Sequence, residues 1–221
     1  MHSLWEQTSA SSGFETLRQD IETDVLIIGG GMAYTFMAGV LCAYLLQQAG
    51  VSYVLAEAET VCSGITKNTT AKITLQHGLI YDKLIRAFDL ERARQYLNAN
   101  EKALEKYRQL CADIDCDFEE KDAYVYSLDN PRGLEKEILA IEKLGGHAEF
   151  CDRLPLPFPV AGAVKYANQA QFHPLKFISA ISKGLHIFEH TAVRELADLR
   201  VALEALGAVD DGAPGLFQTF R

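Results

Sequence analysis

The sequence of 221 residues lacks features that mark several classes of protein. It has no run of about 18 consecutive apolar residues, so it predicts no membrane-spanning helix. Its first residues, Met-His-Ser-Leu-Trp-Glu, lack the basic start and the apolar block of a secretory signal. Positive charge is scarce, because 21 Lys and Arg stand against 30 Asp and Glu. The formal net charge of −9 argues against a nucleic-acid partner.

Cysteine is also sparse. The five cysteines are odd in number and form no Cys-x-x-Cys pair, which predicts reduced thiols, a cytoplasmic location and no disulfide framework. Cys42 lies in an apolar stretch, where we expect a buried small hydrophobe. Because His147, His186 and His190 have no acidic or cysteine partner at ligand spacing, no metal site is predicted. There is no Gly-x-Ser-x-Gly elbow and no solenoid-scale repeat.

The segment 23–57 carries the most specific pattern that the chain does contain. Thr-Asp-Val-Leu-Ile-Ile leads into Gly29-Gly30-Gly31, an apolar helix follows, and Tyr-Val-Leu-Ala ends at Glu57. This order is typical of a βαβ dinucleotide site. Glycines let the backbone approach a pyrophosphate at a helix N-terminus, and the acid accepts hydrogen bonds from a ribose. An ordinary α/β unit with a glycine-rich turn would show part of the same pattern.

The glycine motif is interrupted. Its third glycine should fall at position 34, where the chain has Tyr34, and the next glycine is Gly39. The Met-Ala pair at 32–33 recurs at 37–38, which indicates an insert of five residues, since 39 − 34 = 5. Either the insert loops out or the helix lengthens and repacks. We expect a distorted first turn. The sequence leaves open whether the insert at 34–38 abolishes FAD binding.

The remaining elements follow from periodicity and from turn residues. Residues 1–22 predict an extended arm, and 62–74, rich in hydroxyl and amide groups, predict a loop for a phosphate or a ring system, or else a solvated connection. Helical spacing covers 81–114, 132–144, 174–183 and 195–206, and the helix at 132–144 ends at a Gly-Gly pair. Strands are expected at 52–56, 123–127, 160–165 and 186–194.

Four stretches together resemble the D-amino-acid-oxidase-type FAD-dependent oxidoreductases, in the branch whose longer members can carry a C-terminal Rieske domain. They are Ser-Leu-Trp at 3–5, the glycine strand at 23–31, Ser-Gly-Ile-Thr-Lys-Asn-Thr-Thr-Ala-Lys-Ile-Thr at 63–74, and Gln-Ala-Gln-Phe-His-Pro at 169–174. The likeness covers about residues 3–196. It implies an α/β fold: a Rossmann-like FAD-binding βαβ core with inserted helices and part of an α+β substrate domain.

The resemblance also assigns domains and cofactor contacts. Residues 1–22 would be an arm, 23–80 the FAD-binding core, 81–170 a helical and partial substrate-domain segment, 171–196 a return to the FAD-binding domain, and 197–221 an atypical tail. Gly29 and Gly31 would line the pyrophosphate, and Met32 would also contact the cofactor. Glu57 would hold the ribose, and Val193, in a strand after His190, would present backbone to the adenine. The phosphates would be contacted by Ser63, Gly64 and Thr66. The flavin ring would lie near Thr70, Ala71 and Lys72.

By the same resemblance, the expected function is transfer of a hydride from a C–H next to nitrogen to FAD, with a small amine or amino acid as the substrate. The atypical tail favours a truncated, frame-shifted or recombined chain, or a shortened one. Two alternatives stay open: a catalytically inactive nucleotide-binding remnant, and an NAD-dependent dehydrogenase module, which Glu57 and the glycine turn would permit. His77 is a candidate for cofactor contact, whereas His173 is expected to have a local structural role. Lys72 could favour reduced flavin by its charge or could be a surface lysine.

Overall fold

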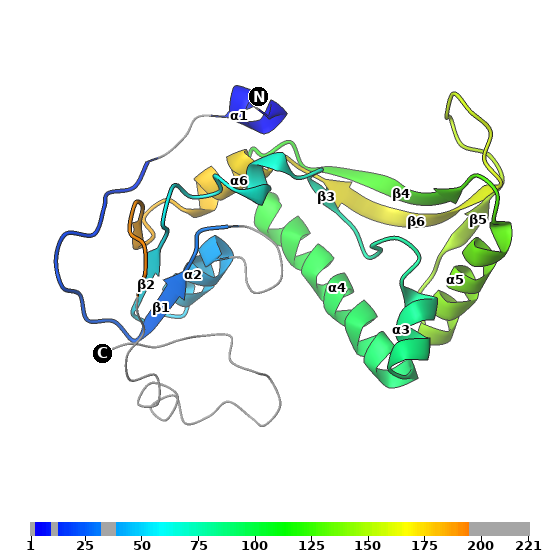
Figure 1. Cartoon of the computed structure of the whole chain (residues 1–221), viewed down its shortest axis with the longest axis horizontal. Helices are drawn as coiled ribbons and strands as arrows, with labels where there is room; N and C mark the ends of the chain where they lie inside the picture. The colour runs from blue at the N-terminus through cyan, green and yellow to red at the C-terminus, as the bar shows by residue number, and fades with distance from the viewer. Residues whose placement is uncertain (1–2, 10–12, 32–38, 195–221) are drawn as a thin grey trace. The chain divides into compact units, whose positions relative to one another are not determined.

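The computed structural model describes residues 3–9, 13–31 and 39–194 (Figure 1). The chain divides into two compact units. Unit 1 comprises Met1–Thr70 and Pro174–Arg221, and unit 2 comprises Ala71–His173. Each unit has its own sheet.

The sheet of unit 1 is parallel and contains β1 (Val25–Ile28), β2 (Tyr53–Ala56) and β7 (Ile187–Phe188). Its strand order is β1-β2-β7, with Val25 opposite Tyr53 and Leu55 opposite Ile187. Read in chain order, this is the 3-2-1 half of a dinucleotide-binding fold. The expected α/β architecture with a βαβ core is therefore confirmed.

Helices α2 and α6 belong to unit 1. Helix α2 (Gly39–Gln48) follows β1, and its buried residues are Gly39, Val40, Cys42 and Ala43. Helix α6 (Pro174–Ile181) has proline at its first position, as the sequence predicts, and buries Phe177 and Ile178. Helix α2 thus packs its first turn into the core, whereas Leu45 further along the helix is 47% exposed.

The N-terminal arm is not wholly extended, so that prediction was wrong. Residues Leu4–Thr8 form helix α1, capped by a reciprocal pair in which the Ser3 hydroxyl accepts from Glu6 N and the Glu6 carboxylate accepts from Ser3 N. Ser-x-x-Glu is a capping box, a signal that was present in the sequence. The rest of the arm lies beside the chain after β7, because Glu189 N donates to Glu15 O and Leu17 N donates to Thr191 Oγ1.

Unit 2 contains an antiparallel sheet built on the long strand β6 (Gly162–Gln171). One edge of β6 pairs with β4 (Glu119–Ser127), and β6 also pairs with the short strands β3 (Lys72–Ile73) and β5 (Glu149–Cys151). The strands β4 and β6 are both longer than the sequence pattern predicted, since the expected ranges were 123–127 and 160–165.

Three helices of unit 2 pack on one face of its sheet (Figure 1). They are α3 (Tyr81–Ala87), α4 (Leu90–Cys111) and α5 (Pro131–Leu144). Their apolar faces meet β6 in one core, in which Tyr81, Leu97, Leu134, Ile141 and Tyr166 are at most 2% exposed. The predicted helix at 132–144 and its glycine stop are confirmed, because Gly145 follows α5 in the left-handed conformation.

The buried carboxylate of Glu137 has a structural role in unit 2. It lies in α5, is 0% exposed, and accepts hydrogen bonds at the start of α3. Glu137 Oε1 accepts from Ile80 N at 2.7 Å and from Tyr81 N at 2.8 Å, and Oε2 accepts from Asp82 N at 3.1 Å. A helix start leaves such N–H groups without intrahelical partners, so Glu137 caps α3 from a neighbouring helix.

The last strand is much shorter than predicted. Strand β7 ends at Phe188, and residues 191–194 are outside any strand. The expectation that Val193 lies in a strand was therefore wrong. The predicted helix at 195–206, the tail, Met32 and the insert at 34–38 lie outside the described residues. In the part of the chain that the structure describes, none of the helices has the length and apolar character needed to cross a membrane.

Candidate cofactor site

The candidate site begins at the turn after β1. Gly29 has φ 99°, a conformation that glycine adopts without steric cost, and its N–H donates to Ala56 O of β2 at 2.9 Å. The first residue of α2 comes against this turn: a Cβ added to Gly39 would lie 1.9 Å from Gly29 O. Gly39 therefore permits the close helix–strand packing for which the motif needs its third glycine.

Glu57, the residue after β2, lies at the same turn. Its Oε2 accepts a hydrogen bond from Gly30 N at 2.7 Å, and its Oε1 accepts from Glu59 N at 2.9 Å. The backbone around Glu57 is also fixed, because Glu57 N donates to Phe188 O and Thr191 N donates to Glu57 O. An acid at the end of the second strand thus reaches the glycine turn at the carboxyl ends of parallel strands, where ligands bind in such folds.

The segment after Glu57 folds back over the glycines. Cys62 N donates to Gly30 O at 3.3 Å, and a Cβ at Gly30 would lie 2.9 Å from Val61 Cγ2. A Cβ at Gly31 would lie 3.9 Å from the hydroxyl oxygen of Thr66, which is 3% exposed. The structure thus brings the predicted phosphate-contacting segment next to the glycine turn.

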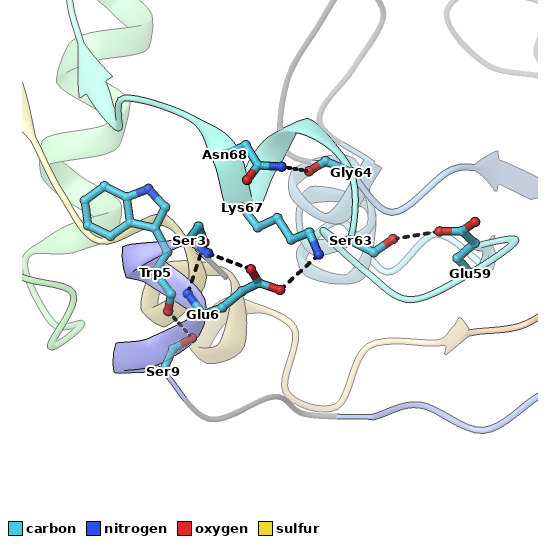
Figure 2. Close-up of polar contacts among 9 residues, drawn as sticks. All are labelled: Ser3, Trp5, Glu6, Ser9, Glu59, Ser63, Gly64, Lys67 and Asn68. Carbon is cyan, nitrogen blue, oxygen red and sulfur yellow. Dashed lines mark hydrogen bonds and ion pairs between the residues drawn. The ribbon is translucent and has the colours of Figure 1, made fainter. Parts of the chain in front are cut away.

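The hydroxyl-rich loop contains a short 3-10 helix, η1 (Ile65–Asn68), preceded by Gly64. The Ser63 hydroxyl lies 3.4 Å from Glu59 Oε2, and Asn68 Nδ2 donates to Gly64 O at 3.3 Å (Figure 2). Figure 2 also shows the side chain of Lys67 directed toward Glu6 of α1. The sequence predicted a loop here but neither η1 nor its contact with α1.

Cys62 is the one thiol beside the turn, and it is not suited to act as a base or nucleophile at neutral pH. It is 5% exposed, and burial raises the pKa of its thiol to about 12. The carboxylates of Glu57 and Glu189 raise this pKa further, against a lowering hydrogen bond with Thr66. The reactive form of cysteine is the thiolate, so Cys62 stays protonated and inert.

The other predicted residues are divided between the two units. Thr70 ends unit 1, whereas Ala71 and Lys72 begin unit 2, where Lys72 is exposed and pairs with Gln171 in the sheet. Ala71 has φ 56°, which is uncommon for a residue with a side chain. His77 is exposed, and Val193 is half-buried outside a strand. Among the described residues no group of three His, Cys, Asp or Glu side chains could hold a metal ion.

His173 was expected to have a local structural role. It is 3% exposed, and its N–H donates to Cys116 O at 2.6 Å.

Two residues near the glycine turn, Gly30 and Glu189, were not predicted from the sequence. Gly30 was overlooked although it lies between the two predicted glycines and binds Glu57. Glu189 is 3% exposed and accepts from Val61 N at 2.7 Å and from Phe14 N at 3.0 Å. Nothing in the local sequence of Glu189 signals this role.

The comparison with known families agrees with this geometry. A sequence model of the DAO family, described as FAD dependent oxidoreductase, matches residues 24–213. The chain belongs to this family. The match runs past residue 196, so the expectation that the likeness ends there was wrong. The DAO family is FAD dependent, and the positive φ of Gly29, the contact at Gly39 and the position of Glu57 fit the adenosine diphosphate part of that cofactor.

One relative is YhfW of Bacillus subtilis (strain 168), whose name describes it as a Rieske 2Fe-2S iron-sulfur protein. It is 38% identical over an alignment of 202 residues, and the match covers 87% of this chain and 38% of the relative. The chain thus spans well under half the length of this relative.

Solved structures show the same fold at low identity. L-proline dehydrogenase from P. horikoshii has a TM-score of 0.61 at 18% identity, over 78% of this chain and 45% of that one. L-amino acid deaminase from Proteus vulgaris, with its specific insertion sequence deleted, has a TM-score of 0.60 at 15% identity, over 85% of this chain and 50% of that one.

Proposed function

We propose that this chain supplies the FAD-binding part, and part of the substrate domain, of an oxidoreductase that acts on a small amine or amino acid. One arrangement carries the proposal: at the end of β1, Gly39 packs against Gly29 and the Glu57 carboxylate accepts a hydrogen bond from Gly30 N. The strands there have the order β1-β2-β7. Unit 1 would bind the adenosine diphosphate part of FAD, and unit 2 would belong to the substrate domain. Five free cysteines support a cytoplasmic location.

The residue roles within this proposal come from the family resemblance and from the geometry together. Gly29 and Gly31 would line the pyrophosphate, Met32 would also contact the cofactor, and Glu57 would hold the ribose. Bound FAD would accept a hydride from a substrate C–H next to nitrogen. Contacts of Ser63, Gly64 and Thr66 with phosphate are supported by the segment that folds over the glycines. Thr70, Ala71 and Lys72 at the flavin ring, and Val193 at the adenine, remain predictions.

The substrate class is supported by the names of the structural relatives, an L-proline dehydrogenase and an L-amino acid deaminase. Both names describe chemistry at a carbon that carries nitrogen. Any role for a Rieske iron–sulfur partner rests on the name of YhfW alone.

The experiment that tests this function has two stages. The purified chain is first titrated with FAD and, separately, with NAD, and the dissociation constants are compared. We expect FAD to bind and NAD to bind far more weakly. A colourless protein that takes up no FAD would contradict the proposal, and tighter binding of NAD would favour a dehydrogenase module.

The second stage is anaerobic. The FAD-loaded chain is mixed with L-proline, with other L-amino acids and with simple amines, and the flavin absorbance is followed. Bleaching by one of these compounds supports the oxidoreductase function and identifies the substrate class. FAD binding without bleaching by any of them would favour a catalytically inactive nucleotide-binding protein.

A further inference from the structure

The contacts between the N-terminal helix α1 and the segment of η1 and its C-cap include a hydrogen bond and an ion pair between residues distant in the sequence. Trp5 Nε1 donates to Thr69 O at 2.9 Å, and Lys67 Nζ lies 2.9 Å from Glu6 Oε1. Figure 2 shows Trp5 and Glu6 on α1 and Lys67 on η1. Both ends of this contact lie in unit 1.

Neither helix is stable by itself. Helix α1 has five residues and η1 has four, and isolated helices of this length are unstable in water. No residue of α1 is buried, and Gly64 gives η1 no side-chain cap. Tertiary contacts, among them the ion pair and the indole hydrogen bond, therefore hold α1 against the rest of unit 1.

One carboxylate joins the two helices. Glu6 Oε2 accepts from Ser3 N at 2.9 Å and so closes the capping box of α1, while Glu6 Oε1 meets Lys67. The side chains of Lys67 and Glu6 are 29% and 25% exposed, so this ion pair is screened less than one on the open surface. The capping of α1 and its attachment to η1 thus depend on the same group.

We propose that α1 is a positioning element for the cofactor site, in which Trp5 and Glu6 hold η1, and with it Ser63 and Thr66, in the geometry that binds FAD. The inference rests on the proposed function. Docking of α1 and binding of FAD are then coupled, and each favours the other by the same factor. Trp5 and Glu6 act through η1 and do not touch the cofactor.

The decisive variant is Glu6→Gln. Its amide oxygen can still accept from Ser3 N, but the negative charge that pairs with Lys67 is gone. FAD is an anion, so removing a negative charge nearby should tighten its binding if electrostatics alone acted. Weaker binding by Glu6→Gln is therefore evidence for positioning, and we expect the dissociation constant for FAD to rise about threefold.

Two further variants complete the set. Lys67→Met removes the other partner of the pair, and Trp5→Phe removes the indole N–H but keeps an aromatic ring. We expect Lys67→Met to raise the dissociation constant about threefold and Trp5→Phe about fivefold. The double variant Glu6→Gln with Lys67→Met should match the single variants, because both remove one interaction.

Matched controls come from unit 2, where Lys121 Nζ lies 3.1 Å from Glu119 Oε2. Glu119→Gln and Lys121→Met make the same changes of charge in an exposed ion pair, and we expect neither to change FAD affinity. Far-UV circular dichroism confirms that each variant is folded.

Trp5 is the only tryptophan of the chain and reports on α1 directly. In Lys67→Met, the Trp5 emission of the apoprotein should shift to longer wavelength as α1 leaves η1. Added FAD should reverse that shift, and the FAD concentration at half-reversal should equal the midpoint of the FAD-binding curve. A purely structural role for α1 would not link Trp5 emission to FAD concentration.

The outcomes separate the inference from the function on which it rests. If the wild-type chain binds FAD and all three variants bind it equally well, the inference is overturned and the proposed function stands. If Lys67→Met weakens binding while Glu6→Gln leaves it unchanged or tightens it, Lys67 contacts FAD itself and the inference is again overturned. A wild-type chain that binds no FAD overturns both.

Discussion

The carboxylate of Glu57 accepts a hydrogen bond from the backbone N–H of Gly30, with 2.7 Å between Oε2 and N. Oε1 meanwhile accepts from Glu59 N at 2.9 Å. An ionised carboxylate offers about four lone-pair sites, so these two bonds leave capacity for two ribose hydroxyls. Glu57 can thus fix the turn between β1 and α2 and still bind the cofactor.

Replacing Glu57 with Ala should weaken both folding and FAD binding. Gly30 is buried, so its N–H would lose its acceptor with no ready access to water, at a cost of about 1–3 kcal/mol. We expect the free energy of unfolding in urea to fall by that amount and FAD affinity to fall at least about tenfold. Glu59→Ala is the control, because Glu59 is exposed and the bond that its side chain accepts from Ser63 is long, at 3.4 Å. Equal effects of the two variants would refute the role of Glu57.

A methyl group at Gly39 should disrupt the contact between α2 and the glycine turn. The added Cβ would lie 1.9 Å from Gly29 O, which is backbone and cannot rotate away. We expect Gly39→Ala to lower the free energy of unfolding by about 1–3 kcal/mol and to weaken FAD binding. Gly13→Ala adds the same methyl group where no atom lies within 4 Å and serves as the control. If both variants melt at the same temperature, Gly39 is not the packing glycine.

Local pattern was sufficient to predict much of unit 1. An apolar run ended by glycines and a second run ended by Glu57 predict two parallel strands, because these signals lie within each element. These residues indicated a dinucleotide, whereas FAD in particular followed from the family resemblance of four stretches, among them 63–74. The role of Gly39 needed more: the sequence offered it as a displaced glycine, but only the backbone contact with Gly29 shows that it performs the packing.

The parts that were missed depend on contacts between distant residues. Helix α1 is short and apolar burial does not stabilise it, so periodicity gives no signal, and its contact with Lys67 spans 61 positions. The length of β7 is set by pairing with two residues of β2, which the sequence of 186–194 does not reveal. The buried acids Glu137 and Glu189 accept hydrogen bonds from backbone N–H groups 57 and 128 positions away.

The stability of unit 1 should fall at alkaline pH, and Cys62 should contribute to that fall. Burial raises the pKa of Cys62 from its ordinary value of 9.0 to about 12. Between those values the unfolded thiol is ionised while the native thiol keeps its proton, so the unfolded state binds fewer protons. Stability is then present below about pH 9 and is lost as the pH rises toward 12, by up to about 1.4 kcal/mol per pH unit for this group.

Thermal unfolding at about pH 8 and about pH 10.5 measures this dependence. The fall in melting temperature between them should be smaller in Cys62→Ala than in the wild type. Cys151 is the only cysteine among the described residues that is not buried. Cys151→Ala serves as the control, and its melting temperature should fall as much between the two pH values as that of the wild type. If Cys62→Ala has the same pH dependence as the wild type, the Cys62 thiol of the wild type ionises similarly in the native and the unfolded state.

Glu137 should prove a residue of stability, because its carboxylate caps α3 from within α5. Glu137→Ala removes the acceptor of one buried and two part-buried N–H groups, and we expect the free energy of unfolding to fall by about 2–4 kcal/mol. Glu137→Gln keeps the oxygen that serves Ile80 and Tyr81 and loses the one that serves Asp82, so its loss should be clearly smaller. Urea denaturation followed by circular dichroism measures both, with Glu135→Ala on the exposed face of α5 as the control. If Glu137→Ala unfolds at the same urea concentration as Glu135→Ala, the backbone N–H groups of α3 do not depend on this carboxylate.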